Sequence, residues 1–366
     1  ALIIGAGLAG ATLARALAER GVAVTVLDKG GIAGAASGNE QGVLYTRLSR
    51  RHSALTDFAL QSFRYSASFY RQLLGTDDLQ EPLGGQLCGS FHQHSDVEEL
   101  QLMRERLQAL PELASVLSTE EAARYLGVRP AQPGYWYPDS GWLSPPAVCR
   151  ALLTTPGIEV IERCGELSLH HHSGQWLARN AGGSDVLAAD VAIVCAGTSS
   201  TGLAGLDWLP LQAIRGQTSH LPASPASSEL KSVLCHKGYI SPAVRGRHCI
   251  GASFKLQDPE TTVRQQEHVE NIEKLLAALP QWRDAMADMN FDELDGRVGF
   301  RCASPDYLPI AGAVPDRSGF LQDYASLRKN ARQLIAKRGK YVPGLFVNTA
   351  HGSRGLTSAP LCAQVL

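Results

Sequence analysis

The feature that most constrains this chain is a glycine-rich turn close to its start. An apolar segment, Leu2–Ile4, leads into the pattern G-x-G-x-x-G at Gly5, Gly7 and Gly10, and a helical pattern follows. Each glycine has its own physical role: Gly5 permits the tight turn, Gly7 lets a pyrophosphate approach the backbone, and Gly10 lets the helix pack closely on the strand. The sequence therefore predicts a strand-turn-helix unit whose helix N-terminus faces an anion.

The residues after this turn favour a dinucleotide as the anion. Residues 11–20 have the apolar spacing of a helix that Gly21 ends, and residues 22–27 have the β-branched composition of a buried strand. That strand stops at Asp28, where a carboxylate can accept hydrogen bonds from a ribose diol, with Lys29 beside it. The alternative is a glycine-rich turn without a ligand, in which case the acidic residue is coincidental.

Composition sets limits on the function. With 366 residues and 44% hydrophobic content, the chain can bury a large core and is long enough for two joined domains. The formal net charge of −1 excludes a globally basic nucleic-acid coat, so an RNA partner requires a local patch. The eight cysteines have neither a C-x-x-C pair nor metal-ligand spacing, which predicts reduced thiols, no metal site and a cytoplasmic location. Neither a signal peptide nor an apolar run of about 20 residues is present.

The ends of the chain and its later strands indicate how it is organised. The chain begins inside a strand without Met and stops inside a helical pattern, so we expect a part of a longer polypeptide. After a helix expected over residues 144–153, the buried strand of residues 191–198 ends in the small residues Ala196 and Gly197. Residues 345–350 form a further strand that runs into a second glycine-containing turn, residues 351–355. In a doubly wound sheet such turns meet at the carboxyl ends of the strands.

Short strands and hairpins separate these segments. Residues 134–143 are rich in aromatic residues and are expected to form a strand at a domain seam, with core packing as the alternative to a role in a pocket wall. Residues 238–242 and 248–254 read as a hairpin, followed by a helix over residues 261–279.

We therefore predict an α/β protein, α+β overall. It combines a Rossmann-like dinucleotide-binding domain assembled from residues 1–81, 142–210 and 303–366 with an antiparallel-sheet substrate domain of residues 82–141 and 211–302.

Four further motifs carry a resemblance to a known family. They are Ala36-Ser37-Gly38-Asn39 with Gln41-Gly42, the segment 137–143, the segment 309–312 and, most specifically, the segment 348–356. On these residues the chain resembles the flavin amine oxidases that include glycine oxidase and D-amino-acid oxidase. It is most similar to the FAD-dependent oxidoreductase half of the bifunctional tRNA-modifying MnmC family.

This resemblance implies FAD as the cofactor. The loop of residues 30–42, whose alternative is a plain surface loop, would lie against the phosphates and the flavin, and the turn 351–356 would direct amide groups to the flavin N1/C2 carbonyl edge. The implied cofactor residues are Gly5, Gly7, Leu8, Ala9, Gly10, Asp28, Lys29, Ser37, Gly38, Asn39, Gln41, Gly42, Ala196, Gly197, Gly312, Gly352, Ser353, Arg354, Gly355 and Leu356. The methyltransferase half of that family is absent here, so we expect no methylation by this chain and a methyltransferase domain as a fused or associated partner.

The resemblance also implies a reaction: oxidation of the carboxymethylaminomethyl group on a wobble uridine of tRNA, with glyoxylate released and aminomethyluridine left. Positioning and electrostatics are sufficient for this chemistry, so no catalytic acid or base is assigned. Arg301 is the expected partner of the substrate carboxylate; the alternative is a structural arginine paired with Asp306 or another acid. Tyr239 would shape the pocket or sit in the core, and His351 would be a turn residue near the flavin.

Two basic clusters are candidate tRNA contacts, with a solvated basic face as the alternative for each. They are Arg328, Lys329, Arg332, Lys337, Arg338 and Lys340 in a stretch without acidic residues, and Arg47, Arg50 and Arg51. Two other functions remain open at this point. One is oxidation of a free small molecule such as glycine, sarcosine or a D-amino acid, and the other is a non-catalytic flavin- or tRNA-binding module.

Overall fold

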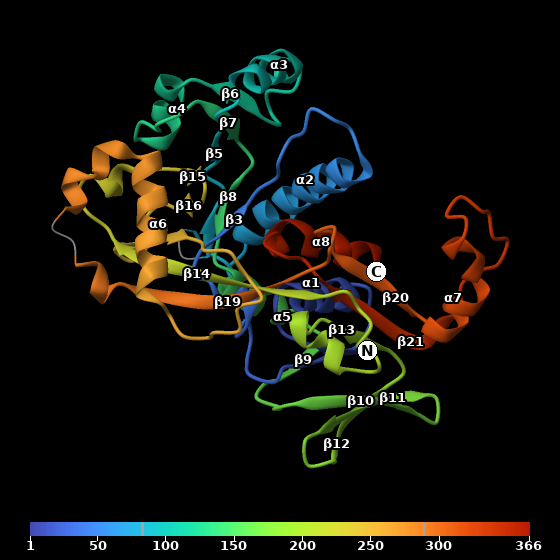
Figure 1. Ribbon diagram of the computed structural model, residues 1–366. Helices are drawn as coiled ribbons and strands as arrows, with labels where there is room; N and C mark the ends of the chain where they lie inside the picture. Colours follow the sequence, from blue (N-terminus) through green and yellow to red (C-terminus); the bar gives the residue numbers. More distant parts are fainter. Residues whose placement is uncertain (82–83, 288–289) are drawn as a thin grey trace.

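A mostly parallel sheet forms the centre of the computed structural model, which describes residues 1–81, 84–287 and 290–366 (Figure 1). Its strand order is β20-β21-β13-β1-β2-β9, in which only β20 is antiparallel to its neighbour. From β9 to β21 this is the doubly wound order 3-2-1-4-5, the order that binds dinucleotides at the strand carboxyl ends. The strands are β1 (Leu2–Ile4), β2 (Val24–Leu27), β9 (Ile158–Ile161), β13 (Ala192–Val194), β20 (Ile310–Pro315) and β21 (Tyr341–Thr349).

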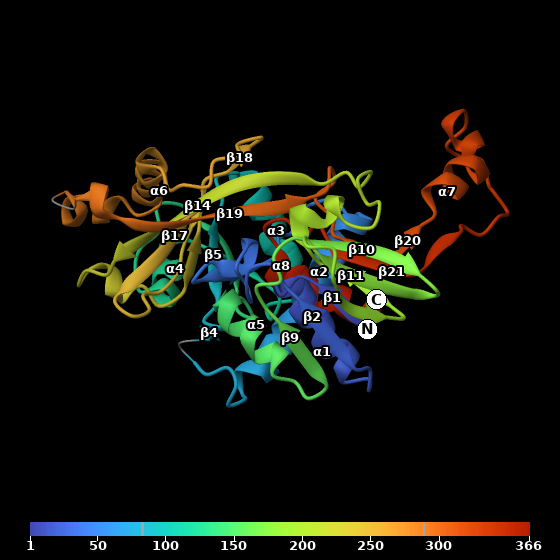
Figure 2. The same cartoon turned by 90° about the horizontal axis from the view of Figure 1, so that it is seen from below.

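Helices cover one face of this sheet and a small sheet covers the other (Figure 2). Because side chains alternate along a strand, Ile3 packs under the helices whereas Leu2 and Ile4 pack on the opposite side. The helices are α1 (Leu8–Ala18), α2 (Ala54–Leu74), α5 (Pro145–Leu153) and α8 (Gly355–Val365). The small sheet consists of β10 (Leu167–His172), β11 (Gln175–Asn180) and β12 (Asp185–Ala189), and its Trp176 is buried in the core.

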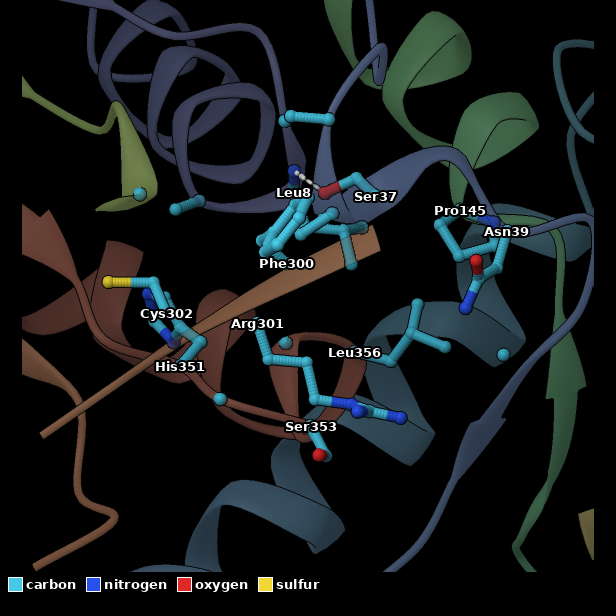
Figure 3. A pocket seen from close by; sticks show the side chains of 18 of the residues that line it. Leu8, Ser37, Asn39, Pro145, Phe300, Arg301, Cys302, His351, Ser353 and Leu356 are labelled. Carbon is cyan, nitrogen blue, oxygen red and sulfur yellow. Dashed lines mark hydrogen bonds between the residues drawn. The ribbon is translucent and has the colours of Figure 1, made fainter. Parts of the chain in front are cut away.

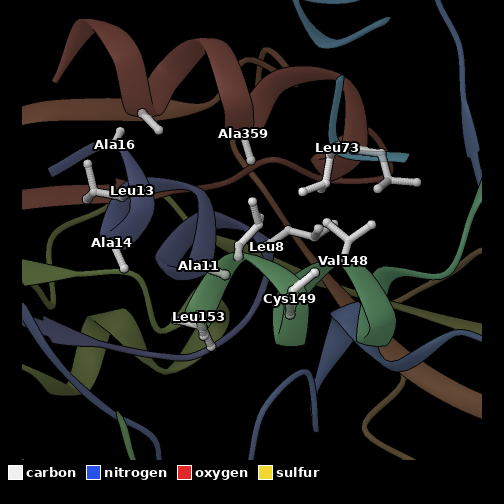
Figure 4. Close-up of a cluster of buried hydrophobic side chains, with 14 of the residues drawn as sticks. Leu8, Ala11, Leu13, Ala14, Ala16, Leu73, Val148, Cys149, Leu153 and Ala359 are labelled. Carbon is white, nitrogen blue, oxygen red and sulfur yellow. The ribbon is translucent and has the colours of Figure 1, made fainter. Parts of the chain in front are cut away.

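Small side chains allow the helices over the sheet to pack closely (Figure 4). Ala11 and Ala14 of α1 lie in one buried cluster with Cys149 of α5 and Ala359 of α8. A side-chain contact also joins the first and last helices, because the Thr12 hydroxyl hydrogen-bonds the carbonyl oxygen of Ala359 at 3.4 Å. The two ends of the chain are therefore fixed against each other under the glycine turn.

A larger, mainly antiparallel sheet lies beside this unit, and α6 (Gln265–Ala278) covers one of its faces. Its order is β18-β14-β17-β16-β15-β5-β7-β6, with β19 also paired to β14. The strands are β5 (Ser90–Gln93), β6 (Ser115–Leu117), β7 (Gly134–Tyr137), β14 (Gln212–Pro222), β15 (Val233–Cys235), β16 (Tyr239–Ile240), β17 (Arg247–Gly251), β18 (Lys255–Leu256) and β19 (Asp295–Ala303). The helices α3 (Val97–Leu107) and α4 (Thr119–Leu126) flank its β6 edge.

The remaining elements are short. A third sheet of β3 (Gly42–Leu44), β8 (Gly141–Leu143) and β4 (Gly85–Gln86) joins the two larger parts. The β20–β21 connection carries α7 (Arg317–Asp323), which projects from the body of the molecule (Figure 1). Short 3-10 helices occur at Ala36–Gly38, Gly197–Gly202, Ser227–Glu229, Pro280–Trp282, Asp284–Met286, Phe291–Glu293 and Ala325–Arg328.

The predicted fold class is confirmed, with corrections to individual elements. The aromatic segment 134–143 is wrong as one strand, because β7 and β8 belong to different sheets on either side of a turn. The first helix begins at Leu8 instead of residue 11, the second strand begins at Val24 instead of residue 22, and α6 begins at Gln265 instead of residue 261. The division into two domains stays a prediction; its boundary at residue 82 lies outside the described residues.

Two findings concern the whole chain. All eight cysteines are free thiols. In the ranges that the structure describes, no helix combines the length and the apolar character that crossing a membrane requires.

Candidate cofactor and substrate site

A cavity of about 740 Å³ lies where the carboxyl ends of the parallel strands face the antiparallel sheet. Asp28 and Lys29 line it at the end of β2, whereas Glu99 and Tyr135 line it on the far side, at α3 and β7. This volume is within the range of cofactor and substrate pockets. Its walls come from segments throughout the chain, so only the folded chain forms the site.

The first glycine turn is shaped by close backbone approaches. Gly5 has φ +112°, and a Cβ atom there would lie 2.5 Å from the carbonyl oxygen of Cys195 in the neighbouring strand. A Cβ on Gly10 would lie 1.8 Å from the carbonyl oxygen of Gly5, so α1 can only pack on β1 without a side chain. The N–H groups of Gly7 and Ala9 line the cavity side of the turn and have no acceptor among the described residues. These unpaired donors at a helix N-terminus fit a phosphate group.

The loop of residues 30–42 crosses this helix N-terminus. The Leu8 N–H donates to Ser37 Oγ at 3.1 Å, and the two residues meet at the cavity wall (Figure 3). Arg297, which the sequence analysis missed, fixes the loop from the antiparallel sheet. Its guanidinium donates to Asn39 Oδ1 at 3.2 Å and to the Gly34 carbonyl oxygen at 3.1 Å, and burial lowers its pKa.

Asp28 organises the turn as well as lining the cavity. One carboxylate oxygen accepts a hydrogen bond from the Ala6 N–H at 2.8 Å, and the other accepts from the N–H groups of Gly30 and Gly31, each at 2.9 Å. Each carboxylate oxygen has two lone pairs, and the group lies on the cavity wall. The neighbouring Lys29 pairs with Glu166, which lines the same end of the cavity.

The second turn follows β21 and is tied to the first. Asn348 donates from Nδ2 to the Ala9 carbonyl oxygen at 3.4 Å and accepts at Oδ1 from His351 Nε2 at 3.0 Å. The other ring nitrogen of His351 lies 2.8 Å from Ser358 Oγ. Burial lowers the pKa of His351 to about 4, so its ring is neutral and both nitrogens are engaged. The hydrogen bonds of His351 lie within its own turn, and one asparagine connects the two turns.

The α8 N-terminus presents unpaired donors to the cavity. The backbone N–H groups of Ser353, Gly355 and Leu356 find no acceptor among the described residues, and all three residues line the cavity. Such N–H groups, together with the helix dipole, stabilise negative charge. The geometry thus fits the predicted contact with the electron-rich edge of a flavin.

Arg301 lies on β19 and enters the same cavity (Figure 3). Its guanidinium donates to the Ser253 carbonyl oxygen at 3.1 Å and lies 5.6 Å from the centre of the Phe254 ring. Burial lowers its pKa, but an arginine remains a cation at neutral pH. No carboxylate of the described residues lies within 4.0 Å of it, and Asp306 instead accepts from the Ser304 hydroxyl at 2.7 Å. The alternative of a structural arginine paired with Asp306 is therefore wrong.

Tyr239 and Gln41 have different surroundings. The Tyr239 hydroxyl donates to the Gln41 carbonyl oxygen at 3.2 Å, the residue lines the cavity, and burial raises its pKa. The Gln41 side chain, in contrast, is buried in the antiparallel sheet. It donates to the Pro242 carbonyl oxygen at 3.0 Å and accepts from the Cys249 N–H at 3.1 Å. Gln41 therefore fastens the loop to a hairpin instead of lining the cofactor cavity.

Most of the predicted cofactor residues line the cavity, and five do not. Those that do are Gly5, Gly7, Leu8, Ala9, Asp28, Lys29, Ser37, Asn39, Gly42, Ala196, Gly197, Gly352, Ser353, Gly355 and Leu356. Gly10 and Gln41 have the packing roles given above, a Cβ on Gly38 would collide with the Arg297 guanidinium, and Gly312 lies on β20 away from the cavity wall. Arg354 is not itself a lining residue, but its guanidinium lies 5.9 Å from the centre of the ring of Tyr45, which is one.

Several residues on the cavity wall were not anticipated from the sequence. Tyr45, His92, Tyr137 and His236 line it. The only sequence signal for these wall residues is the alternation of side chains along their strands. In the sheet, His92 of β5 pairs with Tyr135 of β7 on one side and with Cys235 of β15 on the other. Burial, with Arg47 nearby, lowers the pKa of His92 to about 3, and burial beside Lys274 lowers that of His236 to about 4.

The two basic clusters are separated. Arg47 lines the cavity and is exposed, and Arg50 pairs with Glu99 at 3.3 Å beside it. The second cluster is on the projection between β20 and β21, at the opposite end of the molecule from α6 (Figure 2). All of its six cations are exposed, and Lys337 pairs with Asp323 at 2.9 Å. Both clusters stay predicted tRNA contacts.

Comparisons with known proteins agree with this geometry. In sequence, the chain is 42% identical over 371 residues to the tRNA 5-methylaminomethyl-2-thiouridine biosynthesis bifunctional protein MnmC of Stutzerimonas stutzeri (strain A1501), covering 100% of this chain and 55% of that protein. It is 40% identical over 376 residues to the protein of the same name from Chromobacterium violaceum, with the same coverage. The chain thus spans about half the length of the curated relatives it matches.

Solved structures show the same fold. Glycine oxidase from Geobacillus kaustophilus superposes with a TM-score of 0.74 at 21% identity, over 99% of this chain and 91% of that chain. Iminodiacetate oxidase from Chelativorans sp. BNC1 gives 0.73 at 23% identity, over 99% and 92%. The family model described as FAD dependent oxidoreductase matches residues 1–366. With two glycine turns that leave N–H donors free on one cavity wall, the chain belongs to the family of FAD-dependent oxidoreductases and uses FAD.

Proposed function

We propose that this chain removes the carboxymethyl arm from the carboxymethylaminomethyl group of a wobble uridine in tRNA, with glyoxylate released and aminomethyluridine left. The observation that carries the proposal is Arg301, a partly buried guanidinium without a carboxylate partner among the described residues, in the cavity that the two turns share. A carboxylate is the ligand such a fork binds best. The relatives at 37–42% identity, whose names describe biosynthesis of a modified tRNA uridine, support tRNA as the carrier of that carboxylate.

FAD, when bound, supplies the hydride acceptor. The N–H groups of Gly7 and Ala9 would hold its pyrophosphate, Asp28 its ribose, and the turn at Ser353, Gly355 and Leu356 the electron-rich edge of its ring system. The domain that binds the cofactor would consist of residues 1–81, 142–210 and 303–366. The domain that binds the substrate would consist of residues 82–141 and 211–302. Because the proposed substrate is a tRNA, we place the reaction in the cytoplasm, with a methyltransferase domain as its partner.

The role of the protein in the reaction is positioning. Arg301 would hold the substrate carboxylate, so that the adjacent methylene lies at a fixed place in the cavity. The partly buried histidines of the cavity, His92, His236 and His351, are neutral at pH 7 because desolvation lowers their pKa values to about 3, 4 and 4. They therefore add no positive charge next to an amine that has to be neutral to be oxidised. Arg301 and Tyr239 are accordingly positioning residues, and we assign no acid or base.

A second candidate is oxidation of a free small molecule such as glycine, sarcosine or a D-amino acid. It is favoured by the same guanidinium, because any such molecule carries the carboxylate that Arg301 would bind. A non-catalytic binding module is the third candidate, which substrate-dependent flavin reduction would exclude.

Product analysis tests the proposal. The enzyme is incubated with tRNA that carries the carboxymethylaminomethyl group, and the nucleosides are then digested and analysed by mass spectrometry. We expect aminomethyluridine and one glyoxylate for each nucleoside converted. Glyoxylate formed from glycine or sarcosine, with the tRNA nucleoside unchanged, would support the second candidate instead.

A further inference from the structure

The cavity also has a region away from the two glycine turns. This region is lined by Tyr45, Arg47 and Leu48 from the segment after β3, His92 from β5 and Tyr137 from β7. We call these five residues the aromatic arm. Tyr45 and Arg301 line the same cavity, so the arm shares its space with the proposed carboxylate site.

The rings of the arm form a continuous wall. The His92 ring centre lies 5.8 Å from that of Tyr45 and 4.8 Å from that of Tyr137, which meets it edge to face. Tyr137 is only 2% exposed and supports the wall from behind, whereas Tyr45 and His92 are partly exposed. Two accessible rings on a rigid base provide the kind of surface on which a planar base stacks.

The charges at the arm favour a ligand with phosphate groups. Arg47 is exposed at the wall, and the Arg354 guanidinium lies over one face of the Tyr45 ring, 5.9 Å from its centre. Neither guanidinium has a carboxylate within 4.0 Å among the described residues. A free amino acid needs neither the aromatic wall nor a second and third cation, because one guanidinium satisfies its only carboxylate. A nucleotide needs all three features: a stacking surface, cations for phosphate and an open path to the reacting centre.

We propose that the aromatic arm holds the pyrimidine ring of the substrate nucleotide, stacked on Tyr45, with Arg47 beside the phosphate backbone. This inference rests on the proposed function, because the carboxylate on Arg301 fixes the C5 substituent and thereby directs the ring into the arm. The uridine has to be unstacked from its neighbours to enter, as in other enzymes that act on a nucleobase.

The test replaces Tyr45 in the FAD-loaded enzyme and measures anaerobic flavin reduction by an anticodon stem-loop that carries the carboxymethylaminomethyl group. Tyr45→Leu keeps much of the apolar bulk but removes the π face. It is expected to raise the apparent Kd for the stem-loop about 10-fold or more, with the limiting rate within about two-fold. Tyr45→Phe keeps the ring and should match the unmodified enzyme. Tyr125→Leu, at a 49% exposed tyrosine outside the cavity, is the matched control. Bound FAD and Tm, measured for each variant, show that the fold is intact.

Each result decides one question. If Tyr45→Leu binds the stem-loop as tightly as the unmodified enzyme, the base lies elsewhere and the inference is wrong, while the proposed function stands. If Tyr45→Leu and Tyr45→Phe weaken binding equally, the hydroxyl and not the stacking face is responsible, which also contradicts it. If the unmodified enzyme is not reduced by the stem-loop at all, the proposed function fails first, and this inference fails with it.

Discussion

The residue that most directly links this structure to a substrate is Arg301. A buried guanidinium loses hydration, and proteins usually compensate that loss with a carboxylate. Here a backbone carbonyl and the Phe254 ring are the contacts that the structure gives it. A substrate carboxylate would complete this set. The neutral imidazole of His351, in contrast, has no need of a substrate group, because both of its ring nitrogens already have partners within the turn.

Removing the guanidinium should therefore weaken substrate binding and leave the cofactor in place. For Arg301→Ala we expect an apparent Kd for modified tRNA raised by about 100-fold, because one partner of a buried charge pair is missing. Arg301→Lys should be intermediate, because it keeps the charge but loses the fork. Flavin reduction at a series of tRNA concentrations measures the apparent Kd of both variants. The control is Arg64→Ala, which removes an exposed arginine on α2. Unchanged kinetics in Arg301→Ala would remove it from the site.

The buried His351 should make the protein sensitive to acid. Its folded-state pKa of about 4 is below the ordinary 6.5, so between these values the unfolded state binds more protons than the folded state. The stability contribution is therefore complete above pH 6.5 and is lost as the pH falls toward 4. In this window, we expect the unfolding free energy of His351→Gln to change less steeply with pH. The difference in slope should correspond to at most one bound proton. His52→Gln, at an exposed histidine, should keep the original slope, and identical slopes in all three proteins would refute the assignment.

Among the elements, the two strand-to-helix turns do most to define the site. The sequence predicts both, because glycines at fixed spacing after an apolar strand have few other structural uses. It does not predict Arg297, which reaches the loop from a strand more than 250 positions later in the chain. Nor does it predict that the Gln41 side chain turns into the antiparallel sheet, since a glutamine in a polar loop has no sequence signal for its partner. Local motifs were therefore predictable, and the contacts between distant segments were not.

The packing of α1 on β1 should tolerate no side chain at Gly10. A Cβ atom 1.8 Å from the Gly5 carbonyl oxygen forces the helix away from the strand, at a cost of about 1–3 kcal/mol or more. We expect Gly10→Ala to lower Tm and to purify with little FAD. Gly75→Ala, where the nearest atom would be 3.4 Å from the new Cβ, is the matched control. Normal flavin content in Gly10→Ala would contradict the close packing.

The projection between β20 and β21 should contribute to tRNA affinity through charge alone. Arg328, Lys329 and Arg332 are exposed and have no carboxylate within 4.0 Å among the described residues. If they bind phosphates, replacing all three with Ala should lower the slope of log K against log salt by about 0.7–0.9 for each phosphate that is no longer neutralised. Arg179→Ala removes a partly exposed arginine paired with Asp185 and should leave the slope as it is. An unchanged slope in the triple variant would make this a solvated face.

At the scale of the whole molecule, the cavity exists only because the chain returns to its first sheet three times, at β9, β13 and β20. The glycine turn at the start and the turn after β21 are joined by Asn348, and the antiparallel sheet closes the opposite wall. The sequence predicts this discontinuous architecture, since buried strands with small-residue ends recur far apart. The aromatic arm is not predicted, because β5, β7 and β15 become neighbours through long-range pairing alone.

The central claim is that this assembled cavity oxidises an amine attached to a tRNA base. Anaerobic mixing of the FAD-loaded enzyme with tRNA that carries the carboxymethylaminomethyl group tests it most directly, with the absorbance of the oxidised flavin as the readout. We predict rapid bleaching by this tRNA, slow bleaching by free glycine and none by tRNA without the group. Bleaching by glycine with no response to the modified tRNA would contradict the claim.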